Sequence, residues 1–170
     1  DSRVSRGLGD VYKRQHATFA EQLSAMLNFY NIQPQSIALE ITESSMIFKH
    51  GEVRQALSDI SKLGVELHLD DFGTGYSSLS MLHDLPISTV KLDKSFVHGS
   101  HKGSKAIVQA THAICDKLGL KVVAEGVETE TQKAFLIDCG YQYLQGFLFS
   151  KPIPSNEVER QFLTGRLIDI

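Results

Sequence analysis

The sequence has no excess of positive charge, few cysteines and no long apolar run. Its formal net charge is −3, so nothing indicates a general attraction for a nucleic-acid polymer, and a polyanionic ligand would need local cations or metal ions. Cys115 and Cys139 lack C-x-x-C spacing and are expected to be reduced core residues. No apolar segment approaches the roughly 20 residues of a membrane span, and residues 1–15 do not resemble a signal peptide. We therefore expect a cytoplasmic domain, whose parent protein could still be anchored in a membrane.

Short β-prone runs alternate with helical patterns from Ser36 onward. The alternation predicts five strands, at residues 37–42, 65–69, 89–93, 121–124 and 142–145. Helical patterns separate them, and a closing helix is predicted over residues 157–163. Gly64, Gly119 and Gly140 each follow a helical pattern and precede a strand, where glycine commonly ends a helix. Thr129 and Gln132 match a capping box at the start of a further helix.

Repeated strand–helix units predict an α/β fold with a parallel sheet. Such a sheet is either open and doubly wound or closed into a TIM-type (βα) barrel. An open sheet usually binds a nucleotide through a G-x-G-x-x-G turn, and no early loop here has that pattern. The positions of the ionisable residues favour the barrel, because the carboxyl ends of its strands meet at one mouth.

Ionisable residues close four of the predicted strands. They are Glu43, Asp70, Asp71, Lys91, Asp93 and Glu125. Carboxylates gathered at one mouth repel one another, and oxygen-ligated divalent cations commonly relieve that repulsion. The adjacent pair Asp70 and Asp71 could bind two metals about 3.5–4 Å apart, an arrangement that suits phosphoester hydrolysis. Any one of these residues, Glu43 for example, could instead be a helix cap or a solvated turn residue.

The segment Asp71-Phe72-Gly73 also matches the D-F-G motif of protein kinases. No glycine-rich loop precedes it, and neither H-R-D nor A-P-E is present, so we reject that interpretation. Gly73, Thr74 and Gly75 are better explained as part of a mobile loop over the site.

Several segments resemble the EAL family of cyclic di-GMP phosphodiesterases, over about residues 16–165. The matching segments are L-E-I-T-E-S at 39–44, L-D-D-F-G-T-G-Y-S-S at 69–78, V-K-L-D at 90–93, V-A-E-G-V-E at 123–128 and Q-G-F-L-F-S-K-P at 145–152. The resemblance implies hydrolysis of cyclic di-GMP to linear pGpG with two Mg²⁺ or Mn²⁺ ions per site. It also implies a homodimer through the loop and helix at Phe72–Leu85, and upstream sensor or GGDEF-type domains in the parent protein.

The resemblance also implies a role for each matching residue. Glu43 and Asp70 resemble the ligands of one metal, and Asp70 and Asp71 those of the other. Lys91 resembles the residue that orients the attacking water, and Glu125 the general base or a further metal ligand. The remaining implied roles are loop anchoring by Glu128, with Gly73, Thr74 and Gly75 in the loop it stabilises, and substrate contact by Gln145 and Asp93.

The Glu-Ala-Leu signature itself is missing from the chain. Gln55-Ala56-Leu57 lies inside a predicted helix, and the first asparagine, Asn28, lies on an amphipathic helical run rather than on a ligand-bearing strand. A complete barrel takes about 250 residues. We therefore expect residues 16–170 to be a partial domain, inactive alone, and residues 1–15 to be a leader foreign to the family.

Three uses of this sequence remain open. The intact parent could hydrolyse cyclic di-GMP, bind it as a non-catalytic receptor, or serve as a protein-interaction module through the segment at 72–85. His68 shares a strand face with Asp70, and we expect it to be a hydrogen-bonded interior residue rather than a metal-tuning one.

Overall fold

One parallel sheet organises the chain, as the computed structural model shows for residues 19–43, 50–75, 79–99 and 102–160. Its strands are β1 (Ala38–Thr42), β2 (Glu66–Phe72), β3 (Thr89–Leu92), β4 (Lys121–Ala124) and β5 (Tyr143–Leu144). All neighbouring strands pair in parallel, and their order in the sheet is their order in the sequence. A doubly wound sheet would reverse direction at a switch point, whereas sequential order belongs to a TIM-type barrel. The predicted fold class is therefore confirmed.

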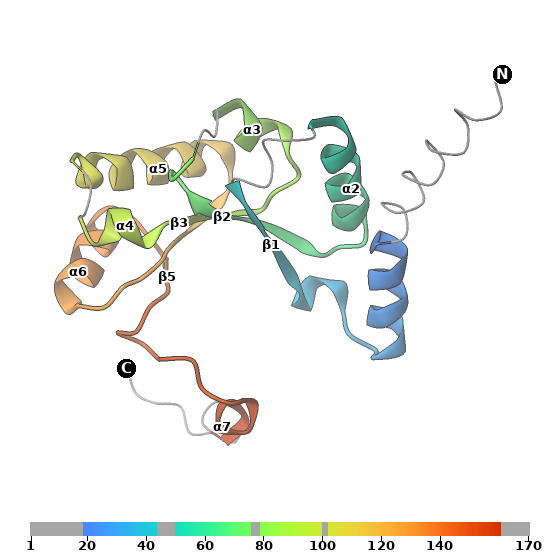
Figure 1. Ribbon diagram of the computed structural model, residues 1–170. Coiled ribbons are helices and arrows are strands. Elements are labelled where there is room, and N and C mark those ends of the chain that lie inside the picture. Colours follow the sequence, from blue (N-terminus) through green and yellow to red (C-terminus); the bar gives the residue numbers. More distant parts are fainter. Residues whose placement is uncertain (1–18, 44–49, 76–78, 100–101, 161–170) are drawn as a thin grey trace.

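Helices connect the strands and cover one side of the sheet (Figure 1). A helix over residues 19–29 precedes the short 3₁₀ turn η1 (Pro34–Ser36). The others are α2 (His50–Lys62), α3 (Leu79–Asp84), α4 (Lys94–Val97), α5 (Ser104–Leu118), α6 (Glu130–Asp138) and α7 (Ser155–Val158). In Figure 1, α2, α3 and α5 lie on the same side of the sheet, whereas α7 lies apart from it near the C-terminal end.

The two faces of the sheet differ in polarity because strand side chains alternate. Leu67, Leu69, Val90 and Leu92 are almost completely buried on the helix-covered face, in the apolar core. The opposite face carries polar side chains. Parallel register places Thr42 beside Asp70 on this face, and the face corresponds to the inside of a barrel.

Local sequence signals predicted most element ends correctly. Gly64, Gly119 and Gly140 have φ values of 91°, 70° and 94°, in the left-handed region that favours glycine after a helix. Both halves of the capping box at Thr129 and Gln132 are formed. The larger differences from expectation are that β2 runs on to Phe72 rather than ending at residue 69, that β5 has two residues rather than four, and that α7 begins at Ser155 rather than at residue 157.

Both cysteines are free thiols, as predicted. Cys115 is fully buried in the core, and burial raises the pKa of its thiol to about 11. Cys139 is half-buried, and burial is also the main cause of its raised pKa. Within the described ranges, no helix is both long and apolar enough to cross a membrane.

Candidate functional site

Two successive carboxylates, Asp70 and Asp71, lie close together at the end of β2. The register between β2 and β3 shifts between Leu69 and Phe72, and Asp71 has a φ of 56°, an uncommon conformation for a residue other than glycine. In a regular strand, Asp70 and Asp71 would point to opposite faces. Here Asp70, Asp71 and Glu125 each offer an oxygen atom within 4.8 Å of the others. The sequence prediction of a carboxylate cluster at the strand ends is therefore confirmed for these three residues.

Lys91 lies at the centre of this cluster. Its Nζ is 2.8 Å from Glu125 Oε1, 2.7 Å from Glu40 Oε1 and 3.1 Å from Asp70 Oδ1, and only 7% of its side chain is exposed. Burial by itself lowers the pKa of Lys91, but the three carboxylates more than offset this effect and the net pKa is raised. Lys91 therefore keeps its proton among these carboxylates and acts as a hydrogen-bond donor, which makes it unsuited to the role of a general base.

The carboxylates lack enough positive charge to balance them. Burial is the main cause of a raised pKa at both Glu125 and Asp71; Lys91 opposes that rise at each, and neighbouring carboxylates add to it. Asp70 Oδ1 is buried and, among the described residues, receives no hydrogen bond, although Lys91 Nζ lies 3.1 Å away. A buried carboxylate oxygen that shares one ammonium group with two further carboxylates fits an oxygen-ligated divalent cation.

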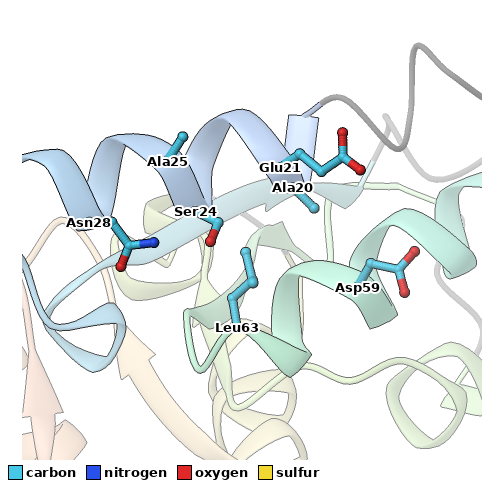
Figure 2. A pocket seen from close by; sticks show the side chains of 7 residues that line it. All are labelled: Ala20, Glu21, Ser24, Ala25, Asn28, Asp59 and Leu63. Atoms are coloured by element: carbon cyan, nitrogen blue, oxygen red, sulfur yellow. The ribbon is translucent and has the colours of Figure 1, made fainter.

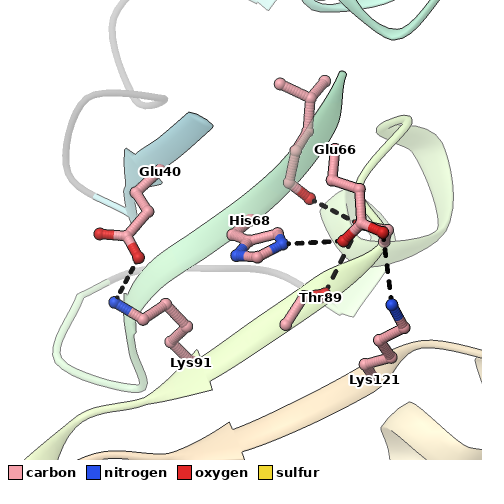
Figure 3. Close-up of polar contacts among 8 residues, drawn as sticks. Glu40, Glu66, His68, Thr89, Lys91 and Lys121 are labelled. Carbon is pink, nitrogen blue, oxygen red and sulfur yellow. Dashed lines mark hydrogen bonds and ion pairs between the residues drawn. The ribbon is translucent and has the colours of Figure 1, made fainter. Parts of the chain in front are cut away.

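Sequence reasoning missed Glu40 as a site residue. The close-up in Figure 3 shows its carboxylate reaching Lys91 from β1. The signal was available: Glu40 interrupts the apolar residues Leu39 and Ile41, so strand alternation places it on the polar face with Asp70. The prediction instead took the acidic residue at the end of the run, Glu43.

Glu43 lies beneath the loop that follows β2. Its side chain is 2% exposed, and its Oε2 accepts hydrogen bonds from the backbone N–H groups of Gly73 (2.9 Å) and Gly75 (3.2 Å). Thr74 supports the same turn by donating its hydroxyl to the carbonyl of Asp71 at 2.9 Å. Glu43 thus holds the described part of this loop, while its role as a metal ligand and the loop-anchoring role of Glu128 stay predictions.

Glu128 is exposed, and its Oε1 lies 3.9 Å from His98 Nε2. Asp93 caps the start of α4, because its Oδ1 accepts from the Ser95 N–H at 3.0 Å. Gln145 is held at the end of β5 through its backbone, which bonds to Ala124 and Val127. Substrate contact by Asp93 and Gln145 stays a prediction.

A second polar layer lies on the same face of the sheet, away from the strand ends (Figure 3). Glu66 contacts His68 Nε2 at 3.1 Å and Lys121 Nζ at 3.3 Å. His68 is therefore a hydrogen-bonded residue on the inward face, as predicted.

A separate hollow of about 510 Å³ lies between the helix over residues 19–29 and α2 (Figure 2). Asn28 lines it from the surface of its helix, which confirms the prediction that Asn28 is a helix-surface residue. One of the two carboxylates that line the hollow, Asp59, is already bound by Lys62 and Gln55. This hollow therefore lacks the carboxylate cluster of the strand ends.

Comparison with known proteins gives consistent matches. The family profile described as EAL domain matches residues 11–152. The cyclic di-GMP phosphodiesterase PdeR of Escherichia coli is 42% identical over 147 residues, which are 85% of this chain and 22% of PdeR. The chain therefore spans only about a fifth of this curated relative.

Two solved structures show the same fold. The EAL domain of Mycobacterium smegmatis DcpA is 41% identical with a TM-score of 0.80, and the match covers 88% of this chain and 68% of that one. Klebsiella pneumoniae BlrP1, solved with manganese and cyclic di-GMP, is 36% identical with a TM-score of 0.73, and the match covers 78% of this chain and 34% of that one.

Proposed function

Because the chain belongs to the EAL domain family, we propose that the protein containing it hydrolyses one phosphodiester bond of cyclic di-GMP and releases linear pGpG. The observation that carries this proposal is Lys91, held among Glu40, Asp70 and Glu125 beside Asp71. Support also comes from PdeR, which is named a cyclic di-GMP phosphodiesterase, and from BlrP1, solved with cyclic di-GMP.

The charge of the site favours divalent metal ions as cofactors. Four carboxylates face one ammonium group, an excess of three negative charges that would repel a phosphodiester anion. Two Mg²⁺ or Mn²⁺ ions would remove that repulsion, neutralise the phosphate oxygens and make a water molecule more acidic. Asp70 and Asp71 are the residues best placed to hold them, with Glu40 and Glu125 at the edges of the cluster. Manganese in the BlrP1 structure supports this choice.

Lys91 and Glu125 have different roles in the proposed reaction. Lys91 keeps its proton, so it donates hydrogen bonds to the attacking water or to a phosphate oxygen and stabilises negative charge there. Glu125 is mostly buried, and its raised pKa makes its carboxylate a stronger base than an exposed glutamate. We therefore assign to Glu125 the acceptance of the proton of the attacking water. The water oxygen bonds to phosphorus while the phosphorus–oxygen bond to the 3′ oxygen breaks, and the leaving 3′ oxygen takes a proton from solvent, which opens the ring.

Several finer features belong to the same proposal. The 170-residue chain is proposed to be inactive alone, because about a third of the DcpA EAL domain has no counterpart in the match. We also propose that the parent protein acts in the cytoplasm, dimerises through the segment at 72–85 and carries upstream sensor or GGDEF-type domains. Residues 76–78 of that segment lie outside the described part of the chain.

The test is hydrolysis of cyclic di-GMP by the full-length protein with MnCl₂ or MgCl₂, followed by chromatography of pGpG. Glu125→Gln is expected to lower kcat by roughly 10²- to 10⁴-fold, the usual contribution of a positioned acid–base group. Glu130→Gln is the matched control, because the Glu130 side chain is 75% exposed, pairs with Lys133 and belongs to α6 rather than to the carboxylate cluster. Running the 170-residue chain beside the full-length protein tests its proposed inactivity.

Each negative outcome has a meaning. Binding of cyclic di-GMP without turnover in the full-length protein would indicate a receptor. Neither binding nor turnover would indicate a protein-interaction module. Unchanged turnover in Glu125→Gln would remove the general base from the proposal while leaving the activity in place.

A further inference from the structure

The short helix α4 contacts two loops that border the carboxylate cluster. It begins at Lys94, directly after the end of β3 and its cap Asp93. Its buried Phe96 lies so close to Gly73 that a Cβ there would be 2.7 Å from the Phe96 ring. Gly126, with a φ of 68°, leaves no room for a Cβ against Lys94. α4 is therefore packed against both the loop after β2 and the segment that follows Glu125.

The side chain of His98, at the end of α4, binds this second segment directly. His98 Nε2 lies 2.7 Å from the carbonyl oxygen of Gly126. A carbonyl oxygen only accepts hydrogen bonds, so Nε2 carries the hydrogen. The same peptide unit is held from its other end, because the N–H of Val127 donates to the carbonyl of Gln145 at 3.0 Å. The Gly126–Val127 peptide plane is thus fixed at both its polar atoms.

This peptide directly follows Glu125, whose placement matters to the cluster. The backbone N–H of Glu125 donates to the carbonyl of Leu92 at 3.1 Å, and its Oε1 lies 2.8 Å from Lys91 Nζ. Glu125 is therefore fixed on its N-terminal side by β3 and on its C-terminal side by the peptide that His98 holds. Glycine at position 126 gives the backbone more conformational freedom than another residue would. A hydrogen bond from a neighbouring side chain therefore restricts the orientation of the Gly126–Val127 peptide more strongly than it would at another residue.

We propose that His98 is a positioning residue: by donating its Nε2–H to the Gly126 carbonyl, it orients the Glu125 carboxylate toward Lys91 and the metal-ligand cluster. The catalytic part of this assignment rests on the proposed function. The side chain is not needed to end α4, because the backbone N–H of His98 makes the capping bonds to Lys94 and Phe96. Those bonds would survive in any variant that changes only the side chain.

The experiment uses two amide variants of the full-length protein that differ in side-chain length. In His98→Gln the amide nitrogen lies near the position of Nε2 and can still donate, whereas in His98→Asn the amide is too short to reach Gly126. Lys117→Gln is the control, because Lys117 is an exposed residue in the last turn of α5 and lies outside both the carboxylate cluster and the segment at 72–85. Three quantities are measured: the hydrogen-exchange rate of the Val127 amide by NMR, the dissociation constant for Mn²⁺, and kcat and KM for cyclic di-GMP.

His98→Asn is expected to speed Val127 exchange, weaken Mn²⁺ binding and lower kcat, each by about fivefold, the effect of one lost hydrogen bond. KM should change little, because the proposed role of His98 acts through the Gly126 peptide and Glu125 rather than through the substrate. His98→Gln should recover most of each loss, and Lys117→Gln should match the wild type. A purely structural role for His98 would lower the melting temperature without a kcat loss that glutamine rescues.

Two results would overturn the inference. One is an unchanged Val127 exchange rate in His98→Asn, which would mean that the bond does not hold the peptide. The other is faster exchange with unaltered Mn²⁺ affinity and unaltered kcat, which would mean that the peptide does not orient Glu125. If the wild-type protein shows no turnover, the proposed function fails by itself, and the exchange rate and Mn²⁺ affinity still decide the role of His98.

Discussion

Replacing Lys91 with methionine tests how much the positive charge of Lys91 stabilises the carboxylate cluster. The substitution keeps the length of the side chain but removes the ammonium group that Glu40, Asp70 and Glu125 share. Removing one partner of a buried ion pair typically costs 3–5 kcal/mol, because the other charge stays buried. We expect about 3 kcal/mol at pH 7.5, the lower end of that range, since half of the Glu40 side chain is exposed to water.

The loss should depend on pH and on metal. The pKa of Glu125 and of Asp71 is raised in the folded protein, and Lys91 opposes the rise at both. Without Lys91 both pKa values should rise further. A carboxylic acid with a raised folded-state pKa stabilises the fold below its ordinary pKa and loses that effect as pH rises through the folded value. The Lys91→Met deficit should therefore be smaller near pH 5 than at pH 7.5, and millimolar Mn²⁺ should reduce it at pH 7.5.

Urea unfolding of the wild type and of Lys91→Met, first in EDTA and then in MnCl₂, measures the difference in their free energies of unfolding and its response to the metal. Lys62→Met is the matched control, because Lys62 is 67% exposed and pairs with the exposed Asp59 at 2.9 Å. Surface pairs of this kind contribute about 0.2–1 kcal/mol. A deficit no larger in Lys91→Met than in Lys62→Met would refute the central role of Lys91. Equal stabilisation of both variants by Mn²⁺ would refute the link between Lys91 and the metal site.

Two further predictions concern buried groups. Glu43→Ala should leave the N–H groups of Gly73 and Gly75 without this acceptor and lower the free energy of unfolding by about 2–4 kcal/mol. Hydrogen exchange at both glycine amides should become faster. Unchanged exchange would show that other contacts hold the loop. Cys115 should resist thiol reagents until the protein unfolds. Because its folded pKa of about 11 lies above its ordinary 9.0, the buried thiol stabilises the fold below pH 9, and this effect is lost as pH rises through 11. The stability difference between wild type and Cys115→Ala, measured by urea unfolding, should therefore shrink by about 2 kcal/mol from pH 8 to 11, and a constant difference would contradict the assignment.

Local sequence patterns were sufficient for the fold class. The left-handed glycines at 64, 119 and 140 and the capping box at Thr129 act within a few residues of themselves, so neighbouring sequence alone shows them. Alternation of strands and helices likewise follows from the spacing of apolar residues. These features predicted the parallel sheet. They also predicted that Asp70, Asp71, Lys91 and Glu125 lie together at the carboxyl ends of its strands.

The tertiary structure decided between carboxylates that look alike in sequence. Glu40 and Glu43 lie three residues apart, and both suit a site at the end of a strand. Strand direction and register carry Glu40 to Lys91, whereas the turn after β1 carries Glu43 under the backbone of Gly73 and Gly75. A residue's role here depends on which strand lies beside it, and that pairing is set by contacts about thirty to fifty residues away in sequence.

Sequence alone therefore determined which chemistry the protein has available: acidic groups, one lysine and the glycines that let the chain turn. Only the fold determined which of these groups meet. The register shift at Asp71 and the hydrogen bond from His98 to Gly126 have no local sequence signal, because each depends on where a distant strand or helix lies. Hydrophobic spacing fixes the elements, and packing between them fixes the distances at which charges and hydrogen bonds act.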